Sequence, residues 1–536
     1  MNALLGQRLR RDWLQLLLWL LGTYALAAAA VGGVAASYGT LPDRVNVLAA
    51  VMANPVIMLF RGLPSGAELQ PFTLFLIFPF LAMMAAFMST FLAVRHTRTE
   101  EELGRAELVG ATPAGRTTPL VATIVHGALA NLVLAVLVFV AFVAAGFDPF
   151  GCLVAGLAAG AVGCCFVGVG LVAAQLMRTS RGANSLAVWV LLITFFCSGI
   201  GNAAGTPSAD LQSVQSSWLS WLSPFAWGEN TRPFATNTLW PIALTLAVSI
   251  ALIGLALALH AARDMGESRI VERPGRRDAG RVLSTPIGLV WRLSWGAVLG
   301  WSIGGLLTGL LATSLASVIG SLGTEIPAVQ TIFEALSAGG SLEQGMVVIF
   351  FVMVGLLAAC AGVQTVCRAR QEERRGTAGR VRATPVERGR WLADYLVIAF
   401  VALVLVTASA IIGAVIGVAG RRGDWSLARD ALVAGAGQMV AASVFVAITA
   451  LVFVIAPRLT IVLGWTLVML GVVLGLFGAL FGFPEWLVNL SPLAQAPTVT
   501  SDGIDVKGLW WLLAAAVLGV WASLALMRGR ELASGD

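Results

Sequence analysis

The sequence predicts an all-α polytopic membrane protein with about 12 transmembrane helices, arranged as two tandem six-helix repeats with both termini cytoplasmic. Hydrophobic residues fill 58% of the 536 positions and charged residues only 12%. Soluble domains do not approach this composition, or the mean hydropathy of +0.87. Twelve apolar runs are long enough to span a bilayer, and one polar segment of 19 residues occurs twice, 272 residues apart.

The first apolar run, residues 13–38, exceeds the core of a signal peptide, which has about 7–15 residues, so we expect a retained span. A span needs about 20 apolar residues. The other spans of the first half are predicted at 71–94, 118–145, 148–177, 184–203 and 239–261. Those of the second half are predicted at 294–320, 345–367, 391–418, 430–455, 457–482 and 508–527.

Arginine-rich segments set the predicted orientation. They are the N-terminus, both copies of the repeated segment, the 178–182 link, the 263–292 linker and the C-terminus. Basic loops remain on the cytoplasmic side, which places both termini there. We expect a first membrane half at 1–265, a cytoplasmic linker at 266–285 and a second half at 286–536. The arginine-rich composition suggests a bacterial cell membrane as the location.

The repeated segment runs from Arg98 to Arg116 and again from Arg370 to Arg388. Ten of its nineteen positions are identical between the copies: Arg98/Arg370, Glu100/Glu372, Glu101/Glu373, Gly104/Gly376, Ala106/Ala378, Val109/Val381, Ala111/Ala383, Thr112/Thr384, Pro113/Pro385 and Arg116/Arg388. Each copy follows a predicted span and contains acidic residues near its start, and we expect its helix to stop at the Thr-Pro pair. We expect a short cytoplasmic helix in each half, serving as a docking site for a partner.

Other repeats support the duplication. Arg and Trp precede the first span of each half, with an offset of 282 residues between Trp13 and Trp295. Ser223-Pro224 and Ser491-Pro492 precede the last spans, and we expect Pro-broken outer segments there. Pro55 and Pro327 mark two further outer loops, which we expect to be helical.

The interior of the spans contains few polar residues, and acids are nearly absent. The exceptions, for which helix-helix hydrogen bonds are the favoured role, are His126, Asn131, Gln175, Gln364 and Gln438. No Asp/His/Glu cluster is apparent, and the six cysteines lack metal-type spacing, so we expect neither an enzyme nor a metal site. ATP cannot be bound by a P-loop, because the only lysine is Lys507, in the sequence DVKGLW.

The chain resembles the permease subunit of ABC-2-type ABC exporters, especially the fused twelve-span actinobacterial permeases of polyketide-antibiotic (tetronasin-type) or multidrug efflux. The resemblance rests on the segment Arg95-His96-Thr97-Arg98 with its following EEE and GRAEL, on Asn54-Pro55, on the two Ser-Pro segments, and on Arg263-Asp264. It spans most of the chain and implies two ABC-2-like repeats.

The resemblance implies that two copies of a separate ATPase subunit bind ATP and Mg and expel an amphipathic compound, a drug or an antibiotic. Its coupling residues would be Arg98, Glu100, Glu101, Glu102, Gly104, Arg105, Glu107, Arg370, Glu372, Glu373, Gly376 and Arg380. The copies differ where Glu102, Leu103 and Glu107 become Arg374, Arg375 and Gly379, so we expect unequal coupling.

The same resemblance implies that spans two and five of each half line the substrate path. Methionine and aromatic residues there suit large hydrophobic ligands, and the candidates are Met83, Met84, Phe87, Met88, Phe195, Phe196, Phe350, Phe351 and Met353. An ion-coupled multidrug carrier and a lipid exporter are the alternative functions. The scarcity of acids within the spans counts against ion coupling.

Overall fold

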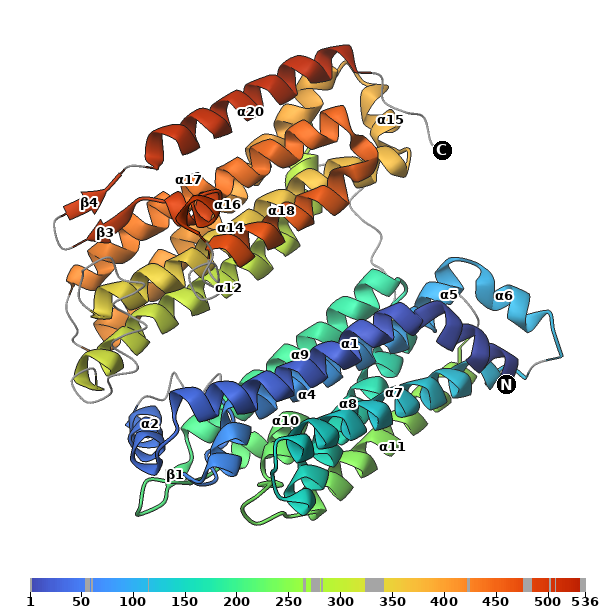
Figure 1. The fold of residues 1–536 in the computed structure, drawn as a ribbon. Helices are drawn as coiled ribbons and strands as arrows, with labels where there is room; N and C mark the ends of the chain where they lie inside the picture. Colours follow the sequence, from blue (N-terminus) through green and yellow to red (C-terminus); the bar gives the residue numbers. More distant parts are fainter. Residues whose placement is uncertain are drawn as a thin grey trace. The chain divides into compact units, whose positions relative to one another are not determined.

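A computed structural model describes residues 2–53, 58, 61–113, 115–263, 267–270, 280, 283–322, 342–421, 425–475, 484–500, 503–506 and 508–530. Predictions that concern Asn54, Pro55, Asp264, Pro327 and Lys507 lie outside these residues, as does the side chain of Arg380. The chain forms two compact units, Met1–Pro274 and Gly275–Asp536 (Figure 1). The described residues contain twelve helices that are long and apolar enough to cross a membrane, which confirms the predicted number.

The first unit contains six of these helices, which run alternately between its two ends: α1 (Asn2–Ser37), α4 (Leu69–Arg95), α7 (Thr118–Ala144), α8 (Pro149–Leu176), α9 (Ser180–Ala203) and α11 (Trp240–Ala261). Local sequence sets several starts. Asp148 accepts a hydrogen bond from Gly151 N at 2.8 Å and caps α8, and Pro149 occupies the first helical position, where its missing N–H costs nothing.

The second unit repeats this plan with α12 (Pro286–Leu322), α14 (Leu342–Arg374), α16 (Arg388–Arg421), α17 (Ser426–Ile455), α18 (Thr460–Gly475) and α20 (Leu509–Gly529). A short 3-10 helix, η2 (Pro457–Leu459), precedes α18. The central helix α8 packs against α4, α7 and α11, and α17 packs in the same way against α14, α16 and α20.

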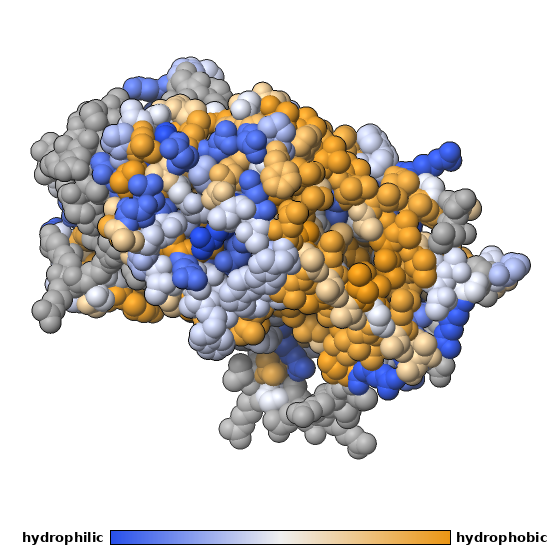
Figure 2. All heavy atoms as spheres, turned by 90° about the horizontal axis from the view of Figure 1, so that it is seen from below, coloured by the Kyte–Doolittle hydropathy of each residue, from blue (hydrophilic) through white to orange (hydrophobic). Residues whose placement is uncertain are grey.

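Small residues allow the helices to approach closely. A Cβ atom on Gly156 of α8 would lie 2.5 Å from the carbonyl oxygen of Ala135 in α7, and one on Gly309 of α12 would lie 1.9 Å from that of Ala410 in α16. Such approaches are typical of membrane bundles, where van der Waals packing drives association. Large apolar side chains such as Leu132 and Ile250 are exposed on the outside. Figure 2 shows a broad hydrophobic surface with hydrophilic residues gathered beside it, as expected for lipid contact.

Polar side chains of the spans form hydrogen bonds between elements, as predicted. Asn131 of α7 donates to Ser89 Oγ of α4 at 2.8 Å. Trp301 of α12 donates to Gln364 of α14 at 2.7 Å, and Gln438 donates to the carbonyl oxygen of Leu493 at 3.1 Å. His126 is the exception, because no hydrogen bond to its ring is found among the described residues.

Each unit has a motif end, where the repeated segment lies, and an opposite end. At the opposite end of the first unit lie α2 (Leu41–Ala53), η1 (Trp218–Leu222), α10 (Pro224–Glu229) and a hairpin of β1 (Thr206–Pro207) with β2 (Val214–Gln215). The second unit has α19 (Glu485–Val488), η3 (Pro492–Gln495) and the hairpin of β3 (Thr498–Thr500) with β4 (Gly503–Asp505). The Ser-Pro segments are therefore broken into short helices, as predicted, whereas the sequence did not indicate the hairpins.

Candidate functional site

The repeated segment does not form one short helix in either half. In the first unit it forms α5 (Arg98–Glu102) and α6 (Arg105–Gly110), separated by Gly104 with a φ of 70°. In the second unit α14 continues to Arg374, and α15 (Thr377–Arg382) begins after Gly376, whose φ is 71°. Glycine adopts this left-handed conformation without the Cβ clash that other residues meet, which explains its identity in both copies.

A buried ion cluster holds the first copy in place. Glu101 receives Arg98 Nη1 on one carboxylate oxygen at 2.5 Å and Arg263 Nη2 on the other at 2.6 Å. Arg98 lies at the start of α5, and Arg263 lies two residues beyond the last span, α11. One carboxylate therefore joins the repeated segment to the end of the last span.

Further hydrogen bonds complete this arrangement. Arg263 Nε donates to Gln175 of α8 at 2.7 Å, as expected for a polar residue that connects helices. Arg98 and Arg263 both donate to the carbonyl oxygen of Glu267, at 2.8 and 2.6 Å. Arg116, the last residue of the repeated segment, donates to the carbonyl oxygen of Arg263.

The second unit builds the same cluster from the equivalent residues. Glu373 receives Arg370 Nη1 at 3.0 Å and Arg530 Nη2 at 2.6 Å, and Arg530 follows the last span, α20. Arg388 donates to the carbonyl oxygen of Arg530 at 2.6 Å, as Arg116 does to that of Arg263. The guanidinium of Arg530 also lies 4.7 Å from the ring centre of Phe453.

Three of the identical positions, Arg98/Arg370, Glu101/Glu373 and Arg116/Arg388, therefore make contacts within their own unit. We call the two buried sites the Arg-Glu-Arg clusters: Arg98, Glu101 and Arg263 in the first unit, and Arg370, Glu373 and Arg530 in the second. Glu373 and Arg98 are almost completely buried. Burying charges is costly unless each is paired and hydrogen-bonded, so this geometry is specified closely and any loss of one partner is expensive.

Three further acids of the two copies, Glu100, Glu102 and Glu372, also have partners nearby. Glu100 lies 2.7 Å from Arg11 of α1 and 3.1 Å from Arg105. Glu102 accepts a hydrogen bond from the backbone N–H of Ser180 at 2.9 Å, at the start of α9. In the second copy, Glu372 accepts a hydrogen bond from Thr377 Oγ1. The first copy therefore also contacts α1 and α9.

The exposed surface of the repeated segment differs between the copies. In the first, Leu103 is 59% exposed, Leu108 is 71% exposed, and Glu107 lies beside them on the surface. In the second, Arg374 and Arg375 are exposed, with Gly379 on α15. We call these the first docking face (Leu103, Glu107 and Leu108) and the second docking face (Arg374, Arg375 and Gly379). One is apolar and acidic, the other basic.

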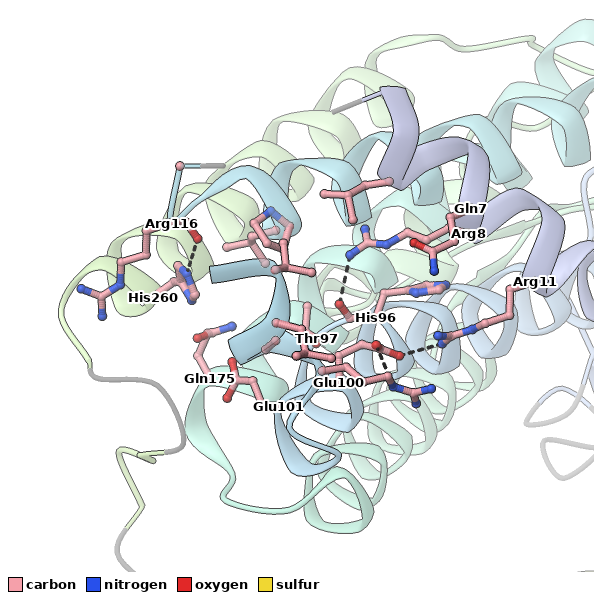
Figure 3. Close-up of a pocket in the computed structure, with 18 residues that line it drawn as sticks. Gln7, Arg8, Arg11, His96, Thr97, Glu100, Glu101, Arg116, Gln175 and His260 are labelled. Atoms are coloured by element: carbon pink, nitrogen blue, oxygen red, sulfur yellow. Dashed lines mark hydrogen bonds and ion pairs between the residues drawn. The ribbon is translucent and has the colours of Figure 1, made fainter. Parts of the chain in front are cut away.

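A cavity of about 510 Å³ lies beneath the first copy, between the start of α1, α5, α6 and the start of α7. Figure 3 shows Arg8, Arg11, Glu100 and Glu101 around it, together with Thr97 and Gln175. Charged groups of both signs line its wall, so it suits a polar or zwitterionic segment rather than a purely apolar ligand.

None of the nine residues predicted for a substrate path lines this cavity. Within their own halves, Met88, Phe195 and Phe351 are buried, and Met353 is exposed. The other five, which are half-buried, are Met83, Met84, Phe87, Phe196 and Phe350. Burial within a unit leaves the three core residues less suited to direct substrate contact than the partly exposed ones.

The sequence did not predict two sets of residues in this region. Arg263 and Arg530 complete the clusters, and the only signal was an arginine shortly after each last span. The expectation that the chain has no Asp/His/Glu cluster is wrong, because Asp12, His96 and His126 lie together near the motif end of the first unit. They are far apart in the sequence.

A buried carboxyl group lies at the opposite end of the first unit. Glu229, the last residue of α10, accepts hydrogen bonds from Asn202 at 2.6 Å and Ser198 at 3.2 Å. Burial raises the pKa of Glu229 to about 7, against the opposing effect of these two hydrogen bonds. The folded protein therefore binds a proton that the unfolded chain releases between pH 4.5 and about 7.

We expect the wild-type protein to lose stability as the pH rises through this window, by on the order of 3 kcal/mol. Glu229→Gln should remove this dependence, because the neutral amide keeps an acceptor for Asn202 and Ser198. Thermal unfolding in detergent between about pH 5 and about pH 8 measures this pH dependence of stability. Glu107→Gln, at an exposed site, is the matched control. A Glu229→Gln profile as steep as that of the wild type would contradict the assignment.

Comparison with known proteins gives a consistent result. The family model described as "Multidrug efflux system permease Rv1217c, C-terminal domain" matches residues 3–260 and 283–528. The chain is also similar to the multidrug efflux system permease protein Rv1217c of Mycobacterium tuberculosis (strain ATCC 25618 / H37Rv), with 34% identity over 514 residues. The similarity covers 96% of this chain and 91% of that relative.

Proposed function

Because the chain belongs to the family of the multidrug efflux system permease Rv1217c, an ABC-type efflux permease family, we propose that it is the multi-pass membrane component of an ATP-driven exporter. It is a permease and not an enzyme. A separate subunit hydrolyses ATP and holds the nucleotide with its Mg, since the chain contains no P-loop sequence.

The observation that carries this proposal is the duplication of the Arg-Glu-Arg cluster. Two similar elements at the motif ends of two six-helix units suit a motor that itself has two copies. Both clusters tie an exposed segment to the end of the last span. A force applied to α5 and α6, or to α15, would therefore reach the membrane helices through a short and rigid connection.

Two copies of an ABC ATPase subunit are the proposed partners, one at each docking face. ATP-driven closure of the ATPase dimer would move both segments and switch the permease between inward- and outward-facing states. Since the first docking face is apolar and acidic and the second is basic, the two contacts are not equivalent.

The exported compound is proposed to be an amphipathic drug or antibiotic. Methionine and phenylalanine side chains that are partly exposed, such as Met83, Phe87 and Met353, offer adaptable apolar contacts for such ligands. Phe196 and Phe350 have similar exposure. Which of them meets the compound would follow from export assays with single alanine variants.

Affinity purification from the native host tests the proposal. A P-loop ATPase should co-purify at two copies per permease, and the complex should hydrolyse ATP faster when an exported compound is added. A permease that purifies alone, and exports with no dependence on ATP, would contradict it.

An ion-coupled carrier is the second candidate, because the structure places acidic and histidine side chains in the spans. Asp12, His96 and His126 are all buried near the motif end, and carriers use such groups to bind coupling ions. Export from vesicles with ATP present and the proton gradient collapsed separates the candidates: the exporter continues, whereas the carrier stops.

A further inference from the structure

Three residues with metal-binding side chains meet near the motif end of the first unit. Asp12 comes from α1, His96 follows the last residue of α4, and His126 lies on α7. One potential ligand atom from each lies within 4.8 Å of the others. Their exposed fractions are 3%, 2% and 0%. Two imidazoles and one carboxylate form a ligand set that suits zinc and similar transition metals.

His126 provides an independent sign of a ligand. Neither of its ring nitrogens has a hydrogen-bond partner among the described residues, although the side chain is fully buried. Its ring centre lies 5.2 Å from that of His96, which in turn contacts Asp12 through Nε2. Buried polar groups normally have partners, and an exception calls for an unseen ion or water.

The fold does not itself require these side chains. Their counterparts in the second half, at the offsets of the repeat, are Ser294, Arg368 and Ile398. The second unit forms its bundle with an aliphatic residue where the first has His126. A purely structural role would not need two histidines and an aspartate in one unit only.

The surrounding charges leave the cluster available to a cation. Arg95 lies 3.0 Å from Asp12 Oδ1, which leaves Oδ2 directed at His96. Arg11 is paired with Glu100 at 2.7 Å, and Arg8 donates to Thr123 Oγ1 at 2.8 Å. Arg95 also donates to Gln15, and Arg11 lies 3.8 Å from the same Oδ1 atom of Asp12. Both guanidiniums thus contact the outer oxygen of Asp12, and a ligand carboxylate held by such outer partners is typical of metal sites.

We propose that Asp12, His96 and His126 bind one divalent transition-metal ion of the zinc class, with water completing its coordination. The ion replaces the contact between His96 and Asp12 and gives His126 the partner that it lacks. It joins α1, α4 and α7 at a point two residues before Arg98, where the first repeated segment begins. The assignment does not depend on the proposed function.

Titration of the full-length permease, purified in detergent with a tag free of histidine and stripped by a chelator, tests this site. The expected result is one Zn²⁺ per chain with micromolar or tighter affinity. Co²⁺ should give the visible absorption bands of a site with nitrogen and oxygen ligands. His126→Leu and Asp12→Asn should each weaken Zn²⁺ binding by about 100-fold or more, since each removes a direct ligand.

His260→Leu is the matched control, because His260 is the third histidine of the chain and lies outside the cluster. It should bind Zn²⁺ as the wild type does. Thermal unfolding without metal checks that the variants fold, and Zn²⁺ should raise the melting temperature of the wild type and of His260→Leu alone. Equal Zn²⁺ affinity in His126→Leu and the wild type, or binding only at millimolar Zn²⁺, would overturn the proposal.

Discussion

Glu373→Ala is expected to destabilise the protein by about 3–5 kcal/mol, because it leaves two guanidiniums facing each other without their shared carboxylate. The side chain of Glu373 is only 2% exposed, so water cannot replace it. Glu101→Ala should act in the same way on Arg98 and Arg263, with a smaller loss because its side chain is 10% exposed. Thermal unfolding in detergent and export from inverted vesicles measure the two consequences, and we expect export to fall at least 10-fold.

A double-mutant cycle separates the ion pair from a general loss of packing. Glu373→Ala with Arg530→Ala should be less destabilised than the sum of the single variants, since the double variant contains no unpaired Arg530 and only Arg370 loses its carboxylate partner. Glu485→Ala is the control, because Glu485 is exposed on α19 and lies outside both docking faces. If Glu373→Ala unfolds at the wild-type temperature, the cluster does not stabilise the segment.

Leu108→Arg is expected to lower recovery of the ATPase and export by about 10-fold or more while the melting temperature stays unchanged. Leu108 is 71% exposed, so the change should not disturb the bundle. The new arginine becomes buried only when a partner covers the first docking face. Truncating or charging a residue that anchors such an interface costs about 2 kcal/mol or more of binding free energy. The measurement is co-purification with the ATPase, followed by stimulated ATP hydrolysis.

Leu211→Arg, at an exposed position of the opposite end, provides the matched control and should leave both quantities unchanged. On the second docking face, Arg375→Glu should also weaken the complex, because a basic surface favours an acidic partner. Full recovery of the ATPase by Leu108→Arg would show that the first docking face is not used.

Much of the fold could be predicted because a bilayer sets the length and composition of its spans. The number of candidate spans, twelve, equals the predicted number, and the two copies of the repeated segment lie at equivalent places in the two units. The sequence did not predict that the helix is interrupted at Gly104 and Gly376, because the polar residues on both sides of each glycine are compatible with one continuous helix. The only sign of the interruption was that both copies have glycine at this position.

The partners within the site depend on tertiary structure. Glu101 and Arg263 are 162 residues apart, and Asp12 and His96 are 84 apart, so no local pattern connects them. Because the acidic residues recur at equivalent places in both halves, the sequence favoured a docking role for Glu101 and Glu373. The structure shows them as internal pairs, whereas neighbouring residues such as Leu108 and Arg375 are exposed and form the proposed docking faces.

Site-specific photo-crosslinking in the native host tests the central claim most directly. A photoreactive amino acid at Leu108 and another at Arg375 should each capture a P-loop ATPase, identified by mass spectrometry of the crosslinked peptide. The same probe at exposed Trp218, at the opposite end of the first unit, should not capture it. Capture of the ATPase from neither docking face, in a permease that still exports its compound, would contradict the account.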